Sequence, residues 1–280
     1  MAELRLKKLA SAAVSYAAML LLAAVMAGPF LWMLSTSLKG EGDVFKSPPQ
    51  WIPDPFHFRN YREIMEAVSF PRFLLNSLKV ATLATLGQLI SCSLAAYAFA
   101  RLRFKGRTAL YVVLLATIMV PPQVTMIPTF MIMRALGWID THYALIVPAF
   151  LGGAFGTFLL RQFFATIPQD LEDAARIDGC GRFRIFWQIV LPLSKPALAT
   201  LGLFTFMAYW GDLLSPVIYL SSPEKMTLTV GLASLQSGAM EARYDLIMAG
   251  ALVSIVPMLV LFVVAQKWFV RGITMTGLKG

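Results

Sequence analysis

Charged side chains that could do chemistry are concentrated at residues 171–192, inside an otherwise strongly apolar chain. Glu172, Asp173 and Arg176 lie there within a few positions of one another. Carboxylates and a guanidinium at this density can bind a partner protein, whereas covalent catalysis also needs a nucleophile, a base and a group that orients the base. No such set is found, so we assign no catalytic residues and predict a contact site.

The first half of this stretch is predicted to be a short helix. Thr166 and Gln169 have the spacing of a capping box, and Gly179 is a natural stop. The acidic residues come early in the helix and the arginine late, which suits the helix dipole. Glu172 and Arg176 are four residues apart and can form an ion pair along the helix.

The second half of the stretch has apolar residues at the helical spacing i, i+3, i+4, i+7, namely Phe183, Phe186, Trp187 and Val190. Arg182 and Arg184 lie off this stripe. A basic and aromatic helix of this kind tends to lie in the membrane interface. Leu191 and Pro192 then end the helix and turn the chain back into the bilayer.

The composition predicts an integral membrane protein. Of 280 residues, 58% are hydrophobic and 14% are charged, well beyond the apolar content of a soluble domain. A net charge of +9 could indicate nucleic-acid binding. Membrane proteins also acquire such a bias, because lysine and arginine are retained in cytoplasmic loops. The positions of the charges therefore decide between the two explanations.

Apolar runs predict an all-α polytopic membrane protein with six transmembrane helices and a cytoplasmic helix between the fourth and the fifth. The third should be kinked or broken by Pro121, Pro122 and Pro128. The six predicted spans are residues 9–38, 80–100, 108–133, 141–160, 196–220 and 246–266. Residues 80–100 are the charge-free body of the second span, whose outer end is begun by Arg72 and Lys79.

The charge distribution orients these spans. Fifteen of the 24 basic residues fall at the N-terminus, at 101–107, at 161–195 or in the tail, and eight fall in the three segments on the other side. Because the two sets of segments are of similar length, both termini are predicted to be cytoplasmic. The basic charge is then explained without nucleic acid.

Asp212 is a lone carboxylate within the fifth span, and a charged residue there should face water, a partner or the subunit interior. It could contact a substrate, with Tyr209 and Trp210 as aromatic platforms. Alternatively, it could satisfy backbone groups freed near Gly211 and Pro216. Weaker candidates for the substrate pathway are the amides Asn76, Gln88 and Gln123, which could equally bind neighbouring helices.

Metal, disulfide and nucleotide sites are not predicted. His57 and His142 have no ligand partners at metal-binding spacing, and Cys92 and Cys180 fall in different settings. No Walker A sequence is present, so ATP that powers this protein would be hydrolysed by another chain.

The charged stretch resembles the EAA loop of membrane subunits in ATP-binding-cassette importers. The resemblance rests on Asp173-Ala174-Ala175, on Gly179, and on the closing Ile189, Leu191 and Pro192. The leading Glu of the family is Asp173 here, and Glu172 could share its role. By this resemblance, the residues that contact the ATPase are Glu172, Asp173, Ala174, Ala175, Arg176, Asp178, Gly179, Ile189, Leu191 and Pro192.

The resemblance covers nearly the whole chain. The motifs NYREIMEA, FPRFLLNSL, AAYAFARLRFKGR, VPPQVTMIP and FVRGITMTGLKG are similar to those of maltose-transporter-type carbohydrate permeases, and the match is to the six-helix subunit. It implies a type I importer in the bacterial inner membrane, working by alternating access. Its partners would be a second permease that is a different chain, an ATPase dimer carrying ATP and Mg²⁺, an external solute-binding protein and a sugar substrate.

The resemblance also suggests domain bounds. Residues 1–69 hold the first span and an external loop, 70–270 the importer domain with its loop at 166–192, and 271–280 a cytoplasmic tail. In some relatives such a tail reaches the ATPase dimer, which Gly277 to Gly280 could do here.

Other functions remain open at this stage. A glycerol-phosphate importer shares these motifs, but an anionic substrate would favour extra cations, and Lys79 is the only basic residue placed within a span. A stand-alone secondary carrier would call for coupling carboxylates or inverted repeats. A membrane enzyme would need clustered His or Asp, which two dispersed histidines do not supply.

Overall fold

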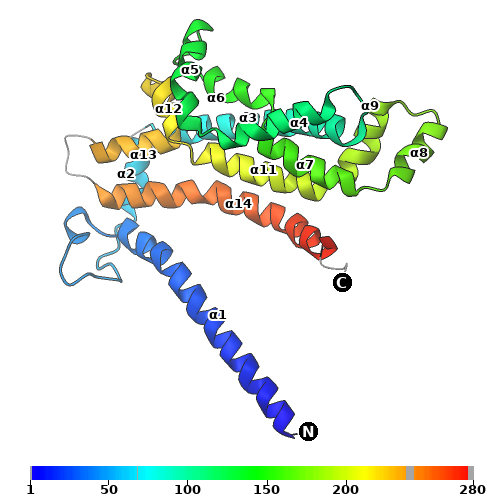
Figure 1. Cartoon of the computed structure of the whole chain (residues 1–280). Helices are drawn as coiled ribbons and strands as arrows, with labels where there is room; N and C mark the ends of the chain where they lie inside the picture. The colour runs from blue at the N-terminus through cyan, green and yellow to red at the C-terminus, as the bar shows by residue number, and fades with distance from the viewer. Residues whose placement is uncertain (1, 68, 238–242, 277–280) are drawn as a thin grey trace. The chain divides into compact units, whose positions relative to one another are not determined.

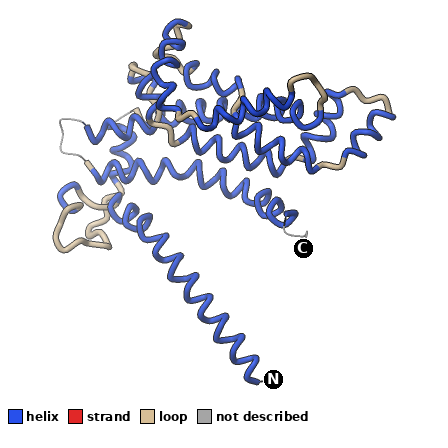
Figure 2. The backbone as a smooth tube through the Cα atoms, in the orientation of Figure 1, coloured by secondary structure: helices blue, strands red, loops and turns tan. Residues whose placement is uncertain are grey.

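The structure is a computed structural model and describes residues 2–67, 69–237 and 243–276. The described residues are helical with connecting loops and contain no β-strand (Figure 2). The chain forms two compact units, Met1–Phe70 with Leu232–Ile255 (unit 1) and Pro71–Gly231 with Val256–Gly280 (unit 2).

Four helical stretches are long and apolar enough to cross a membrane, Ser11–Ser37, Phe70–Arg101, Tyr143–Thr166 and Tyr244–Gln266. Two sharply bent helix pairs also qualify if each counts as one span, Arg107–Met119 with Pro122–Ala135 and Arg182–Leu193 with Lys195–Trp210. The described residues therefore provide between four and six spans. All six predicted spans overlap these segments, with bounds that differ by several residues.

Unit 1 contains α1 (Ala2–Ser37), the 3-10 helix η1 (Glu41–Asp43), α2 (Arg59–Ala67) and the first part of α14 (Tyr244–Thr276). The side-chain amide of Asn60 donates to the carbonyls of Ser37 and Lys39, at 3.0 and 2.8 Å. These bonds fasten the start of α2 to the end of α1. Residues 59–67 were expected only as part of the external loop, and the helix α2 within it was not predicted.

Arg243 is the centre of a charged cluster in unit 1. Its guanidinium donates two hydrogen bonds to Asp245, at 3.0 and 2.7 Å, and one to Glu63 at 3.2 Å. Glu41 lies 3.5 Å away. Asp245, whose side chain is 1% exposed, is the buried carboxylate of this cluster. Hydrogen bonds to Asp245, together with the other two acids, raise the pKa of Arg243 above its ordinary value.

Unit 2 is a bundle of helices in which several spans are interrupted (Figure 1). Its elements are α3 (Phe70–Arg101, from Pro71 on), α4 (Arg107–Ala116), η2 (Thr117–Met119), α5 (Pro122–Ala135), α6 (Tyr143–Ile146), η3 (Val147–Leu151), α7 (Ala154–Thr166), α8 (Gln169–Ile177), α9 (Arg182–Ile185), the π-helical turn η4 (Phe186–Val190), α10 (Leu191–Leu193), α11 (Lys195–Trp210), α12 (Leu214–Tyr219), η5 (Pro223–Lys225), the start of α13 (Leu228–Ser237) and the end of α14.

The third span is broken, as the prolines predicted. The helices on either side of Val120 and Pro121 are bent by 103°. Proline at 121 and 122 removes two backbone donors and disfavours helix in the preceding residue, so the chain turns there. Pro128 lies inside α5 without ending it.

Two further spans are also interrupted. The helix of the fourth span is interrupted at Gly152 and Gly153, and Gly152 has a φ of 93° that favours glycine. It continues past its predicted end to Thr166. The fifth stops at Trp210 and resumes at Leu214 as α12.

Close helix contact is built from small residues, since a Cβ on Gly156 would come within 2.8 Å of the Cys92 sulfur.

A loop segment at 221–228 is tied to two other parts of unit 2. Asp140 accepts hydrogen bonds from the amides of Ser221 and Ser222, at 3.0 and 2.9 Å, and pairs with Lys225 at 2.9 Å. Asn76 of α3 donates to the carbonyls of Glu224 and Met226. These bonds hold residues 221–228 on the start of α3.

Candidate functional site

The predicted charged helix exists as α8, but its first turn is not capped as expected. Pro168 is the N-cap residue, and no side chain caps the helix. The Thr166 hydroxyl instead donates to the Phe163 carbonyl, 2.7 Å away, within the preceding helix. The predicted capping box is therefore wrong, because Thr166 still belongs to α7 and its hydroxyl is used there.

The end of α8 is as predicted. Gly179 has a φ of 79°, in the left-handed region that favours glycine. The amide of Cys180 donates to the carbonyl of Ala175 at 2.9 Å, and that of Gly179 to Arg176 at 3.0 Å. This Schellman arrangement stops the helix and turns the chain toward α9.

The acidic residues of α8 lie in two different environments. Glu172 is 1% exposed, while the Asp173 side chain is 53% exposed. Arg176 contacts both, at 3.4 Å from Glu172 and 2.7 Å from Asp173. The predicted pair between Glu172 and Arg176 is confirmed, and Asp173 is the more accessible carboxylate.

Glu172 has a second partner that the sequence reading did not connect with it. The Nε atom of Arg101, the last residue of α3, lies 3.1 Å from Glu172 Oε1, an ion-pair distance without hydrogen-bond alignment. Nη2 of Arg101 also donates to the carbonyls of Phe164 and Ile167 at the end of α7. A cation at the end of α7 and an anion at the start of α8 both suit the helix dipoles. We call Arg101 and Glu172 the corner pair.

An apolar cluster surrounds the corner pair. Tyr97 lies one turn before Arg101, its ring 5.1 Å from that of Phe186, and its hydroxyl donates to the Arg182 carbonyl at 3.4 Å. Ala175 belongs to the same buried cluster, and Ile189 and Leu191 pack against it. Both halves of the loop are thereby held on the last turns of α3.

The predicted apolar stripe of the second half of the loop is divided between a buried pair and an exposed pair of residues. Phe186 and Val190 are buried, but Phe183 and Trp187 are 71% and 63% exposed and stack on each other. The π-helical turn at 186–190 shifts the period, so that Ile185 takes an inward position.

The remaining residues assigned to the contact face are mostly exposed. Ala174 is exposed on α8, and beside it Ile177, which was not assigned to this face from the sequence, is 87% exposed. Asp178 follows at the helix end, and Pro192 is exposed within α10. We call Asp173, Ala174 and Ile177 the outer face of α8.

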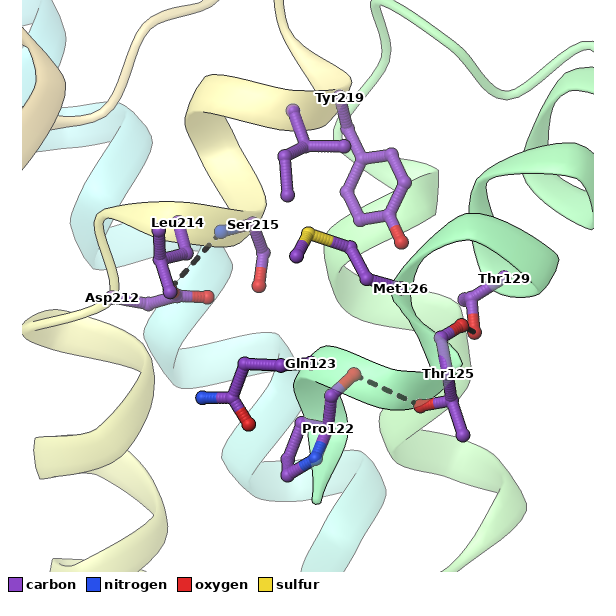
Figure 3. A pocket seen from close by; sticks show the side chains of 10 residues that line it. Pro122, Gln123, Thr125, Met126, Thr129, Asp212, Leu214, Ser215 and Tyr219 are labelled. Atoms are coloured by element: carbon purple, nitrogen blue, oxygen red, sulfur yellow. Dashed lines mark hydrogen bonds between the residues drawn. The ribbon is translucent and has the colours of Figure 1, made fainter. Parts of the chain in front are cut away.

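A cavity of about 290 Å³ lies between α5 and the segment that leads into α12 (Figure 3). It brings together two of the predicted pathway residues, Gln123 and Asp212, which line it from different elements (Figure 3). The other lining residues are polar or apolar but uncharged, namely Pro122, Thr125, Met126, Thr129, Leu214, Ser215, Ile218 and Tyr219. The breaks at Pro121 and at 211–213 create this space.

Asp212 also stabilises the helix break. Its Oδ1 accepts a hydrogen bond from the Ser215 amide at 3.2 Å, in the first turn of α12, and its carbonyl accepts one from the Thr229 hydroxyl at 2.7 Å. The structural role considered for this residue is therefore present, and the same side chain lines the cavity.

The other predicted pathway residues lie elsewhere. Asn76 uses its amide for the 221–228 loop, and Gln88 packs so closely on Gly153 that a Cβ there would come within 2.1 Å of its nitrogen. Trp210 is buried and stacks on Phe206 at 5.6 Å, and Tyr209 is half-buried. None of these four lines the described cavity. The predicted tail contact at 277–280 lies outside the described residues.

Sequence reasoning gave little weight to the uncharged side of the cavity, Thr125, Thr129 and Ser215. The sequence does hold a signal for this polar lining, because Thr125 and Thr129 follow the predicted break by a few residues. It was too common a pattern to single out, since hydroxyls in helices usually bond the preceding turn. Thr129 does so here, donating to Thr125 at 2.7 Å.

Broken apolar spans, a charged helical loop anchored on one span and a polar cavity at the helix breaks define a class of protein, the polytopic membrane transport subunit. A family model, "Binding-protein-dependent transport system inner membrane component", matches residues 89–275. The chain belongs to this family, and its resemblance to importer permeases is confirmed.

Individual relatives agree. The chain is 33% identical over its whole length to the whole galactooligosaccharides transport system permease protein of Bacillus subtilis (strain 168). It is 36% identical to the sn-glycerol-3-phosphate transport system permease protein of Yersinia pestis bv. Antiqua (strain Antiqua), over 83% of this chain and 85% of that one. A solved bacterial ABC transporter involved in import of the acidic polysaccharide alginate has a chain that matches with a TM-score of 0.82 at 25% identity, covering 91% of this chain and 95% of that one.

Proposed function

We propose that this chain is one of two permease subunits of an ATP-driven importer and carries a neutral sugar or oligosaccharide. The observation that carries the substrate class is the lining of the cavity, which holds one carboxylate, one amide and several hydroxyls but neither Lys nor Arg. The family supplies the rest of the assembly, namely an external binding protein, a second permease and an ATPase dimer that hydrolyses ATP with Mg²⁺.

The orientation follows from the charge distribution. The α8 end of unit 2 carries the basic segments at 101–107 and 161–195, and we place it and both termini in the cytoplasm. The 221–228 loop then lies outside, where the binding protein delivers substrate.

In this proposal α8 docks on the ATPase through its outer face. Asp173 supplies a half-exposed carboxylate for a basic partner, and Ile177 an exposed apolar side chain. Apolar surface ringed by charge is typical of a protein contact. Glu172 is turned inward, so its role is to hold the helix.

The docking proposal is tested by Asp173→Lys in the complete transporter, purified through a tag on this chain. We expect normal membrane insertion and the loss of most copurifying ATPase, since the changed charge faces the partner. Asp54→Lys, also at an exposed aspartate, is the matched control and should retain the ATPase. Wild-type ATPase recovery with Asp173→Lys would refute the docking face.

The substrate proposal rests on hydrogen bonding in the cavity. A sugar presents hydroxyl donors that a carboxylate and amides can accept, with Met126 and Tyr219 as apolar surface. A phosphate or carboxylate ligand would meet Asp212 without a compensating cation, which is unfavourable at close range. This observation disfavours the glycerol-phosphate alternative, although one relative carries that name.

The test compares Asp212→Asn with Asp212→Ala. Asn keeps an oxygen for the Ser215 amide and for a sugar hydroxyl, so transport should stay within a few fold of wild type. Ala removes both, and because a hydrogen bond to a charged group contributes about 1.5–3 kcal/mol, we expect transport to fall by at least about tenfold. The substrate is first identified by screening neutral and anionic sugars for thermal stabilisation of the binding protein.

The amount of assembled transporter in the membrane distinguishes the two roles of Asp212, contact with the substrate and stabilisation of the helix break. A transport loss with Asp212→Ala at wild-type amounts of assembled transporter supports substrate contact. Wild-type transport in that variant, or an anionic substrate on the binding protein, would overturn the substrate proposal.

A further inference from the structure

The span α3 has polar contacts at both of its ends. At its last residue, Arg101 meets Glu172 of α8 and the carbonyls that end α7. Near its start, Asn76 and Ser77 bind the 221–228 loop, Ser77 by accepting from the Leu228 amide at 2.8 Å. Asn76 and Arg101 are separated by about 38 Å of helix at 1.5 Å per residue.

The body of α3 is continuous. In the described part of unit 2 the third, fourth and fifth spans are interrupted at Pro121, at Gly152 and at Gly211, whereas α3 runs from Phe70 to Arg101 as one helix. Figure 1 shows it lying along the unit, between the end that carries α8 and α9 and the end that carries α12. An interrupted span can bend at its break, but a continuous helix moves as one body.

We propose that α3 carries the movement of α8 to the outer 221–228 loop, and that the corner pair is the joint through which it does so. Arg101 is then a positioning residue, which acts through Glu172 and never touches substrate or nucleotide. The inference rests on the proposed function, because the ATPase is what moves α8.

The burial of the corner pair supports this role. Its side chains are 9% and 1% exposed, so water cannot easily replace the contact when α8 is displaced. Arg101 uses the same guanidinium for the Phe164 and Ile167 carbonyls, so α7, α8 and α3 are held at one point. A force on α8 therefore reaches α3 directly. The exposed ion pair of Asp173 and Arg176, by contrast, joins two residues of α8 and connects α8 to no other helix.

The test is hydrogen exchange measured by mass spectrometry on the complete transporter in lipid nanodiscs, without nucleotide and with ATP and vanadate. In the wild type, nucleotide should change exchange both in α8 and in residues 221–228. In Arg101→Met/Glu172→Leu the change in α8 should remain, while that at 221–228 falls at least about fivefold, the lower end of typical coupling between sites.

The double variant is chosen because it leaves no buried charge without a partner, so the protein should still fold and assemble. Arg103→Met is the matched control, since it removes an exposed arginine two residues away and should behave as the wild type. Asn76→Ala removes two hydrogen bonds at the other end of the link and leaves the one to Ser77, so it should reduce the nucleotide response at 221–228 while leaving that of α8 intact.

The outcomes separate the inference from the proposed function. If α8 in the wild type does not respond to the ATPase and nucleotide, the proposed function fails. If α8 responds, and residues 221–228 of the double variant respond within twofold of the wild type, the role of α3 is overturned. A merely structural corner pair would alter exchange near α8 without changing the nucleotide response at the far end.

Discussion

Two arginines of this chain are each paired with a carboxylate that is 1% exposed, but the groups that surround the two arginines differ. In unit 2, Arg101 shares its guanidinium between Glu172 and two backbone carbonyls at the end of α7. In unit 1, Arg243 is surrounded by three carboxylates, Asp245, Glu63 and Glu41.

The difference lies in what each arginine connects. Arg101 joins the ends of three helices, so displacing any of them disturbs the contact. Arg243 neutralises acids from η1, α2 and the start of α14, and its side chain is 26% exposed. Water can reach this more exposed site and solvate part of the charge left behind when Arg243 is lost. A paired arginine can therefore transmit position in one region and fix a local fold in another, and the exposure of the arginine distinguishes the two.

A double-mutant cycle on the corner pair tests this contrast between the two arginines most directly. Arg101→Met leaves Glu172 buried and its charge poorly compensated, so we expect a loss of about 3–5 kcal/mol of stability. Arg101→Met/Glu172→Leu should recover most of that loss. The measurement is thermal unfolding of the purified permease in detergent, with both single variants and the double variant side by side.

The cycle has a clear contrary outcome. If the double variant is as unstable as the sum of the singles, the two residues do not interact and the corner pair is not an energetic unit. Arg103→Met should leave the unfolding temperature unchanged.

The corner pair also shows where sequence reasoning reached its limit. The helix α8, its stop at Gly179 and the pair of Glu172 with Arg176 depend on neighbours within a few residues, and all were predicted. The partner Arg101 lies 71 positions earlier in the chain. From the sequence, Arg101 served only as one of the basic residues that place 101–107 on the cytoplasmic side. Only the packing of α3 on α7 brings it to Glu172.

The remaining differences have local physical causes. The break of the third span was predicted because proline removes backbone donors whatever surrounds it. Gln123 and Asp212 were predicted as pathway residues, but their meeting in one cavity could not be predicted, since it also needs the break at 211–213 to lie opposite α5. The predicted stripe at 183–190 is divided between buried and exposed positions because one π-helical turn changes the period, and the sequence carries no signal for that turn.

The Arg243 cluster should give a smaller effect than the corner pair. Arg243→Met leaves the buried Asp245 without its main partner, which we expect to cost about 1–3 kcal/mol. Thermal unfolding measures it, with Arg62→Met, an exposed arginine of α2, as the control. The amount of assembled transporter should fall, while the ATP hydrolysed per sugar imported stays as in the wild type. A changed ratio would mean that this cluster transmits movement too, and the contrast between the two arginines would be lost.

The smallest effect is expected where the carboxylate is partly exposed, at Asp140. Hydrogen bonds from Ser222 and Ser221, together with Lys225, hold the pKa of Asp140 well below its ordinary value. A lowered pKa in the folded state stabilises the loop above the ordinary pKa of about 3.9, and this contribution is lost as pH falls below that value.

Asp140→Asn separates charge from shape at this position. Asp140 has a φ of 56°, which Asn tolerates, and Asn keeps an oxygen for the two serine amides. We expect slightly faster hydrogen exchange in residues 221–228 of the variant from pH 8 down to pH 5. The gap should narrow progressively below about pH 4 and close only where the folded Asp140 itself takes up a proton. Asp54→Asn should show no difference at any pH. Equal exchange in the variant and the wild type at every pH would mean that Asp140 holds this loop by shape rather than by its charge.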